Sequence, residues 1–254
     1  MKIRLSIITL LLLISILVCS CSPNESIPTT TDPVATPTSA KLQESVDMGQ
    51  DYIDSLIFIG ESTTYHLKNR GVLSGGKNTT QVWGDESGTL NLTLSIDTQK
   101  IVYPETGEKL TFREAAARKK PKYVVLTFGL NGAVGNVRLG EEYYKSCYRK
   151  LIGEIKSGSP DTKVILQSAP PVAENMDMSR YSVTLKELNE LIDTLNSWTL
   201  SLAEEDGHKY LATNEVLKDE NGALKLEYQV GDGHHLTAEG YRQMLYYIRT
   251  HAYR

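Results

Sequence analysis

The sequence contains little cysteine, little phenylalanine and tryptophan, and no excess of positive charge. Of its 254 residues 3 are Cys, 3 are Phe and 2 are Trp, and 27 Lys and Arg stand against 31 Asp and Glu. A net charge of -4 without a basic stripe gives no indication of nucleic-acid binding. Only Cys147 lies in the part of the chain expected to fold, which excludes an intramolecular disulfide there.

Long hydrophobic runs are also scarce, and the longest lies near residue 1. It extends from Leu5 to Val18 and follows the basic residues Lys2 and Arg4. A membrane-spanning helix needs roughly 20 apolar residues, so this run is short for a span and typical of a secretory signal peptide. We expect residues 1–20 to be removed and to take no part in the fold.

Val18-Cys19-Ser20-Cys21 ends this run and resembles the bacterial lipobox, in which a cysteine after small residues is lipidated and becomes the new N-terminus. Cys21 fits better than Cys19, because the small Ser20 precedes it. The resemblance implies an extracytoplasmic protein anchored to the bacterial cell membrane through a lipid on Cys21. The alternative is an ordinary signal peptide with incidental cysteines.

Residues 21–42 are rich in Pro, Thr and Ser and contain almost nothing large and apolar. Such a composition buries too little surface to fold and predicts a disordered tether. The folded domain is therefore expected to comprise residues 43–254.

Within that domain, apolar runs typical of strands alternate with helical patterns, which predicts an α/β fold with a parallel sheet and covering helices. Strands are expected at residues 56–60, 79–83, 122–129, 162–168 and 209–213. Helices are expected at residues 43–54, 63–69, 111–120, 140–156, 184–205 and 237–251. Residues 89–102 are ambiguous, and residues 104–107 predict a turn.

Three short segments combine chemically capable residues with places where strands end or the last helix begins. They are FIGESTTYHL at 58–67, FGLN at 128–131 and GDGHHLT at 231–237. Each has a purely structural explanation, since Ser caps helices and Asn, Asp and Gly form turns. Sites in α/β folds, however, form where the carboxyl ends of parallel strands meet, and these segments could meet there.

The residue types also complement one another. An Asp three residues before a His, as in Asp232 and His235, can bind the ring Nδ1 and orient it as a general base. An Asn amide at a strand end, as in Asn131, can donate to a developing oxyanion, and such a donor contributes ~3 kcal/mol to the transition state. Ser62, two residues past Gly60, would supply the nucleophile.

The order of these motifs resembles that of the SGNH or GDSL hydrolases. GESTT at 60–64 matches the nucleophile block, FGLN at 128–131 the Asn block, and DGHHLTAEGY at 232–241 the Asp-Gly-x-His-Leu-Thr-x-x-Gly-Tyr block. The resemblance covers the whole domain from about Asp51. It implies a flavodoxin-like, three-layer α/β/α fold with a parallel sheet of about five strands, and a serine hydrolase acting on carboxylic esters.

The same resemblance assigns roles to individual residues. Ser62 becomes the nucleophile, His235 the general base and Asp232 its orienting acid. Asn131 and the backbone N–H of Ser62 become oxyanion donors. A glycine N–H completes that set, and Gly88 is favoured over Gly84 because its SGTL context resembles relatives.

Four residues depart from the family pattern or compete with it. Glu61 stands where the family has Asp, and Gly132 where it often has Asp. His234 occupies a position that is usually apolar. His66, one helical turn after Ser62, is a rival base, but only His235 has an acid at the right spacing.

These residues and this context predict an esterase that removes small, acetyl-like groups from glycan or cell-wall esters, without cofactor or metal. His234 and His235 could bind zinc, but no further ligands at suitable spacing accompany them. Two alternatives remain: an acyltransferase with the same triad, and a non-catalytic glycan-binding module. The expected partners are an acylated substrate and the membrane, and no nucleic acid.

Overall fold

Five parallel strands form the central sheet of the computed structural model, which describes residues 39–254. Their order is β2-β1-β5-β6-β7, as in flavodoxin-like sheets, so the predicted fold class is confirmed. The strands are β1 (Leu56–Gly60), β2 (Val82–Trp83), β5 (Tyr123–Thr127), β6 (Lys163–Gln167) and β7 (Lys209–Leu211).

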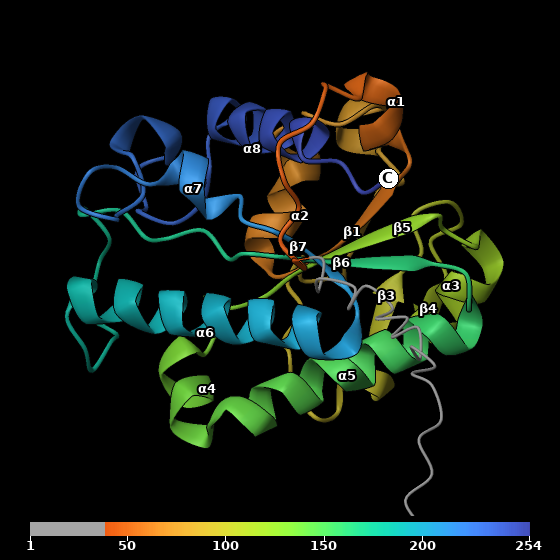
Figure 1. Ribbon diagram of the computed structural model, residues 1–254, viewed down its shortest axis with the longest axis horizontal. Helices are drawn as coiled ribbons and strands as arrows, with labels where there is room; N and C mark the ends of the chain where they lie inside the picture. Colours follow the sequence, from red (N-terminus) through yellow and green to blue (C-terminus); the bar gives the residue numbers. More distant parts are fainter. Residues whose placement is uncertain (1–38) are drawn as a thin grey trace, which may run out of the picture. The chain divides into compact units, whose positions relative to one another are not determined.

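Helices cover both faces of this sheet and complete three layers (Figure 1). One layer contains α1 (Gly49–Asp54), α2 (Ser62–Asn69), α7 (Asn214–Leu217) and α8 (Ala238–Thr250). The other contains α3 (Phe112–Lys119), α4 (Ala133–Leu139), α5 (Glu141–Gly158) and α6 (Leu185–Asp206). Single 3-10 turns lie at η1 (Gly76–Asn78), η2 (Ile96–Thr98) and η3 (Leu226–Tyr228).

The two central strands explain why the sheet is covered on both faces. Every residue of β1 and β5 is buried, as expected of parallel strands that read as continuous apolar runs. They pair in register from Leu56 opposite Tyr123 to Gly60 opposite Thr127. The segments that follow Gly60 and Thr127 therefore leave the sheet side by side at its carboxyl edge.

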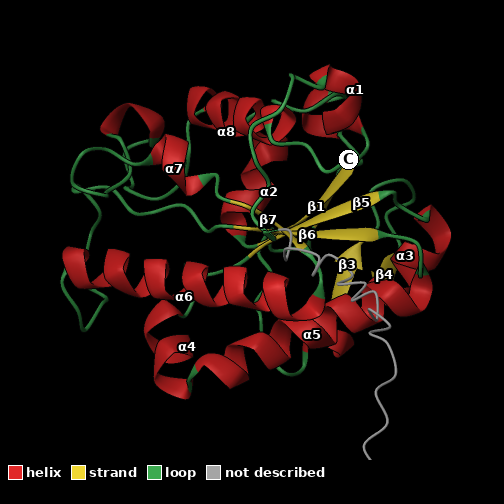
Figure 2. Ribbon diagram, in the orientation of Figure 1, coloured by secondary structure: helices red, strands yellow, loops and turns green. Residues whose placement is uncertain are grey.

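Local structure differs from the sequence expectations in four places. The first helix is shorter than 43–54 and begins at Gly49, and the second strand keeps only Val82 and Trp83. Helix α4 was not expected. A small antiparallel pair, β3 (Lys100–Val102) and β4 (Lys109–Thr111), flanks the predicted turn and appears in yellow in Figure 2.

Residues 39–42, which the sequence assigns to the tether, belong to the same compact unit as the rest of the described chain. Lys41 forms a parallel bridge with Tyr210 of β7. The N–H of Leu42 donates to the Tyr210 carbonyl and the N–H of Tyr210 to the Ala40 carbonyl, each at 2.9 Å. Ala40 and Leu42 are buried, so these residues extend the sheet at its β7 edge.

The predicted signal peptide, Cys21 and the rest of the tether lie outside the described residues. Among residues 39–254, the helices include none that is both long and apolar enough to cross a membrane.

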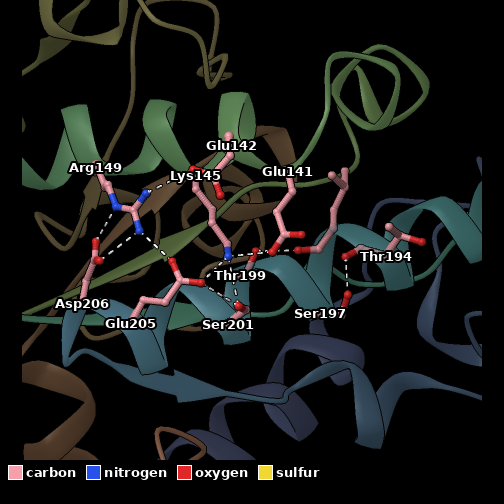
Figure 3. A network of polar contacts seen from close by, with 11 residues as sticks. Glu141, Glu142, Lys145, Arg149, Thr194, Ser197, Thr199, Ser201, Glu205 and Asp206 are labelled. Carbon is pink, nitrogen blue, oxygen red and sulfur yellow. Dashed lines mark hydrogen bonds and ion pairs between the residues drawn. The ribbon is translucent and has the colours of Figure 1, made fainter.

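An ion-pair network joins α5 to α6 (Figure 3). The buried Lys145 places its Nζ 2.6 Å from Glu141 Oε1, 2.5 Å from Glu205 Oε1 and 3.0 Å from Ser201 Oγ. Arg149 also pairs with Glu205, and its Nη2 lies 2.8 Å from Glu205 Oε2. The network fixes the two long helices that cover one face of the sheet.

Candidate active site

The turn from β1 into α2 explains both Gly60 and the position of Ser62. A Cβ at residue 60 would lie 2.3 Å from the carbonyl oxygen of Thr127 and 2.3 Å from Thr64 Oγ1, so only glycine fits. Ser62 is the first residue of α2. Its backbone N–H is one of the first-turn donors that an α-helix leaves free, and it has no partner among residues 39–254. A developing negative charge could be bound there.

Ser62, His235 and Asp232 form a continuous hydrogen-bonded series. His235 Nε2 lies 3.0 Å from Ser62 Oγ, and His235 Nδ1 lies 2.7 Å from Asp232 Oδ2. With Nδ1–H donating to the carboxylate, Nε2 is left to accept the serine proton. The structure thus brings together the three residues that the sequence motifs assign to catalysis, and such a series can activate a hydroxyl group for attack on a carbonyl.

The ionisation of the two acid–base groups suits this task. Burial alone would raise the pKa of Asp232, but N–H groups of His235 and His234 and the His235 ring hold that pKa well below its usual range. Burial lowers the pKa of His235, and the hydrogen bond to Asp232 opposes that effect. Asp232 therefore stays a carboxylate while His235 stays neutral and able to accept a proton.

Close packing holds the loop that carries Asp232 and His235. Gly233 has φ +82°, and a Cβ there would lie 2.5 Å from the Met176 Cα. The Ala173 N–H donates to the Gly233 carbonyl at 2.7 Å. Behind the loop, the buried Tyr241 of α8 donates its hydroxyl to the carbonyl of Thr63, next to the nucleophile. These contacts link the last motif directly to the first.

Glu61 links the nucleophile to the Asn block. Its buried carboxylate accepts the N–H of Gly129 at 3.0 Å through Oε1, and those of Leu130 and Asn131 at 3.1 and 3.0 Å through Oε2. Burial raises the pKa of Glu61 to about 7, and the three N–H donors act in the opposite direction. The departure from the family Asp thus does not disrupt the turn, because the longer side chain spans from β1–α2 to the segment after β5.

The Asn131 side chain points to the loop that contains Gly88. Asn131 Nδ2 lies 3.1 Å from Thr89 Oγ1, which leaves its second amide hydrogen for another acceptor. The Gly88 N–H donates to the Asp85 carbonyl at 3.2 Å within a turn. The carbonyl of Gly84, the alternative donor residue, accepts the Val102 N–H at 2.9 Å. Thr89 brings Gly88 near Asn131, but the Gly88 N–H is already donated within its turn, so the choice of Gly88 over Gly84 as a donor stays a prediction.

Asp232, His234 and His235 are also the one group in the described chain with metal-ligand character. Their ligand atoms lie within 4.8 Å of one another. The Asp232 oxygens, however, already accept the N–H groups of His234 and His235 and face the His235 ring. A metal there would compete with the hydrogen bond that orients His235.

His66 lies beside the site without being a second base for Ser62. Its ring stacks on that of His235, with centroids 4.2 Å apart and planes inclined by 15°. The sequence placed His66 near Ser62 through helical spacing, but not against the base itself. The sequence likewise did not indicate the contacts of Glu61 with residues 129–131, because those contacts depend on the sheet register.

A polar cleft of about 410 Å³ opens beside Asp232 and His234. The segment between β6 and α6 forms its other wall, with Met176, Arg180 and Tyr181 among the lining residues. In contrast, the apolar hollow beneath the turn into α2 has a volume of about 10 Å³. The space next to the site therefore favours a polar substrate portion over a long apolar chain.

The fold, together with a serine at the carboxyl end of β1 beside a histidine and an aspartate, defines a serine hydrolase that acts on esters. The sequence matches the GDSL-like Lipase/Acylhydrolase family over residues 58–243, and the chain belongs to that family. The predicted family is thereby confirmed, and the non-catalytic alternative is set aside.

Solved structures are similar at the level of the fold. One from Streptococcus pneumonia, named for platelet activating factor, is 19% identical with a TM-score of 0.52 and covers 76% of this chain and 81% of that chain. Another, from Desulfitobacterium hafniense and named for lipolytic proteins of the G-D-S-L family, is 16% identical with a TM-score of 0.50 and covers 76% and 95%. No curated protein matches the sequence.

Proposed function

We propose that the protein hydrolyses esters of small acyl groups on polar, glycan-like alcohols through an acyl-enzyme on Ser62. The observation that carries the proposal is the series from Ser62 Oγ to His235 Nε2 at 3.0 Å and from His235 Nδ1 to Asp232 Oδ2 at 2.7 Å. It supplies a nucleophile, a base and an orienting carboxylate in bonding order.

In the first half-reaction, His235 takes the Ser62 proton as Oγ attacks the ester carbonyl. The N–H of Ser62 and the free amide hydrogen of Asn131 stabilise the oxyanion. His235 then returns the proton to the leaving alcohol. In the second half-reaction, His235 activates a water molecule, which releases the acid and restores Ser62.

The clefts support the substrate class. An alcohol portion in the cleft beside Asp232 would meet polar groups that include Asn175, Asp177 and Arg180. The apolar hollow beneath α2, of about 10 Å³, is too small for a long acyl chain. A short acyl group on a hydroxyl-rich alcohol fits both conditions.

Labelling and hydrolysis test the proposal together. A fluorophosphonate should label Ser62, as identified by mass spectrometry of the tryptic peptide. Ser62→Ala and His235→Ala should each lower kcat for p-nitrophenyl acetate by ~10⁴-fold or more. Ser74→Ala and His251→Ala serve as matched controls. Turnover that survives Ser62→Ala would refute the mechanism.

The acyl preference has its own readout. We expect kcat/KM to fall at least ~10-fold from acetyl to octanoyl esters, because the apolar hollow beneath α2 is too small to hold the longer chain. Equal rates across chain lengths would refute the small-acyl assignment.

Adding a glycan acceptor separates hydrolysis from acyl transfer: an esterase releases acetate at the same rate, whereas a transferase forms acetylated glycan.

We also propose that a lipid on Cys21 holds the domain outside the cell membrane. The lipobox-like sequence before Cys21 supports this location. Cys21→Ser should move the protein from the membrane fraction to the soluble fraction of bacterial cells that express it, with Cys147→Ser as the control. An unchanged distribution would refute lipid anchoring through Cys21.

A further inference from the structure

Three histidine rings are packed against one another at the site, although the proposed mechanism uses only one. The ring of His235 has its centroid 4.2 Å from that of His66 and 4.0 Å from that of His234. The His66 ring is the more nearly parallel, at 15° against 43° for His234. His66 belongs to α2, whereas His234 and His235 belong to the loop before α8.

No polar contact accounts for the choice of histidine at residue 66. Its Nδ1 is buried and has no hydrogen-bond partner in the described part of the chain. A buried polar atom without a partner is costly and calls for an explanation other than stability. The contact that remains is the ring face against His235.

The His235 ring is attached through its Cβ–Cγ bond and can rotate about that bond. Its hydrogen bonds join Nδ1 to Asp232 and Nε2 to Ser62. Rotation about Cβ–Cγ carries both nitrogens out of the plane in which these bonds are made. A flat neighbour against the ring face opposes this rotation, and the His66 ring supplies it.

We propose that His66 is a positioning residue that holds the His235 ring in the plane shared by Asp232 and Ser62 and shields that ring from water. The proposal rests on the proposed role of His235 as the base. It assigns His66 no proton transfer of its own.

The charges around His66 are consistent with a neutral support. His235, His234 and Asp232 face it from the loop before α8, and Arg70 faces it from the end of α2. Burial, together with the cationic forms of His235 and Arg70, lowers the pKa of His66 to about 4, while Asp232 acts in the opposite direction. His66 thus stays neutral when His235 accepts a proton, and an imidazolium over a neutral aromatic face is not repelled.

Two substitutions separate positioning from proton transfer. His66→Phe keeps a flat ring without a titratable group, and we expect kcat within ~3-fold of wild type. His66→Ala removes the ring, and we expect kcat to fall ~10-fold or more with little change in KM, because a displaced base misses its geometry. His251→Ala, which removes a ring stacked on Tyr247 at the far end of α8, is the control.

A titration of the His235 ring by NMR gives a readout that needs no activity. Water admitted by His66→Ala should raise the pKa of His235 toward 6.5, whereas His66→Phe should leave it lowered. The acid limb of kcat/KM should move to higher pH in His66→Ala alone.

Several results would overturn the inference. Loss of activity in His66→Phe equal to that in Ser62→Ala would make His66 a proton carrier. An unchanged His235 titration and kcat in His66→Ala would remove any positioning role, as would a loss explained wholly by unfolded protein. Wild type that hydrolyses no ester would defeat the proposed function, while the NMR titration would still decide whether His66 acts on His235.

Discussion

Glu61 shows how one longer side chain couples two parts of the site. Its carboxylate accepts three consecutive backbone N–H groups, from Gly129 to Asn131, at 3.0–3.1 Å. Those residues bear the side chain that would stabilise the oxyanion. Glu61 therefore acts on the reaction through Asn131, without touching the ester.

Substitution of Glu61 should impair kcat and leave KM nearly unchanged. Glu61→Gln offers one oxygen to three donors, and Glu61→Asp, although it restores the family residue, retracts the carboxylate by about 1.5 Å. We expect at least a ~10-fold loss of kcat in both variants. Backbone N–H groups of residues 129–131 would lose their acceptor, and the loop that carries Asn131 would be held less firmly. Steady-state kinetics check this, with the exposed Glu220→Gln as control.

A double-mutant cycle tests the route of this effect. If Glu61 acts through Asn131, Glu61→Gln should cost little further activity in an Asn131→Ala background. Additive losses would contradict it.

Because burial raises the pKa of Glu61 from 4.5 to about 7, its contribution to stability is full below about pH 4.5. Wild type should lose up to roughly 3 kcal/mol relative to Glu61→Gln as the pH rises through 7.

At the scale of single residues, the sequence predicted which residues carry the chemistry better than it predicted which side chains contact one another. Ser62, Asn131, Asp232 and His235 were identifiable because their spacing and order carry the family pattern. The roles of Glu61 and His66 were not, because both depend on side chains that meet only after β1 and β5 pair and the last loop folds back.

At the scale of elements, long helices and buried strands were predictable and short elements were not. Thr111 and Glu114 form the expected capping box at the start of α3. Helix α4 buries only Ala133, so it shows no apolar periodicity. Strands β3 and β4 have three residues each and depend on pairing with each other.

The α5–α6 network gives a prediction about pH and stability. Lys145→Met keeps the buried stem but removes the charge that pairs with Glu141 and Glu205, so we expect Tm to fall by ~2–6 °C. Hydrogen bonds from Lys145, Ser201 and Arg149 lower the pKa of Glu205 from 4.5 to about 2. That contribution is present above about pH 4.5 and is lost as the pH falls toward 2.

Thermal unfolding between pH 2 and 7 checks this prediction. Lys145→Met should show a smaller fall in Tm on acidification than wild type. Lys186→Met, at a residue whose side chain is 87% exposed and pairs with Glu190 at 3.7 Å, should leave the profile unchanged. Parallel profiles for Lys145→Met and wild type would contradict a stabilising role for the pair.

At the scale of the whole molecule, the segment of residues 39–42 extends the sheet. The sequence could not reveal this, because a four-residue edge segment is too short to show a period within a stretch rich in Pro, Thr and Ser. Its assignment depends on β7, whose residue Tyr210 lies far away in the chain.

Removing residues 39–42 should therefore destabilise the domain. The truncation loses two backbone hydrogen bonds and the burial of Ala40 and Leu42. Offset by the entropy of ordering a short segment, the net loss should be about 1–3 kcal/mol. Urea unfolding of chains that begin at Ser39 and at Gln43 measures it. Equal midpoints would contradict the boundary at Ser39. In the shorter chain the β7 edge is exposed, which should also promote aggregation.

The direction in which Ser39–Leu42 runs separates the beginning of this segment from the catalytic end of the sheet. The segment is parallel to β7, so Ser39 lies at the amino edge of the sheet, while Ser62 follows the carboxyl end of β1. An attachment made at Ser39 would therefore start at the end of the sheet opposite Ser62.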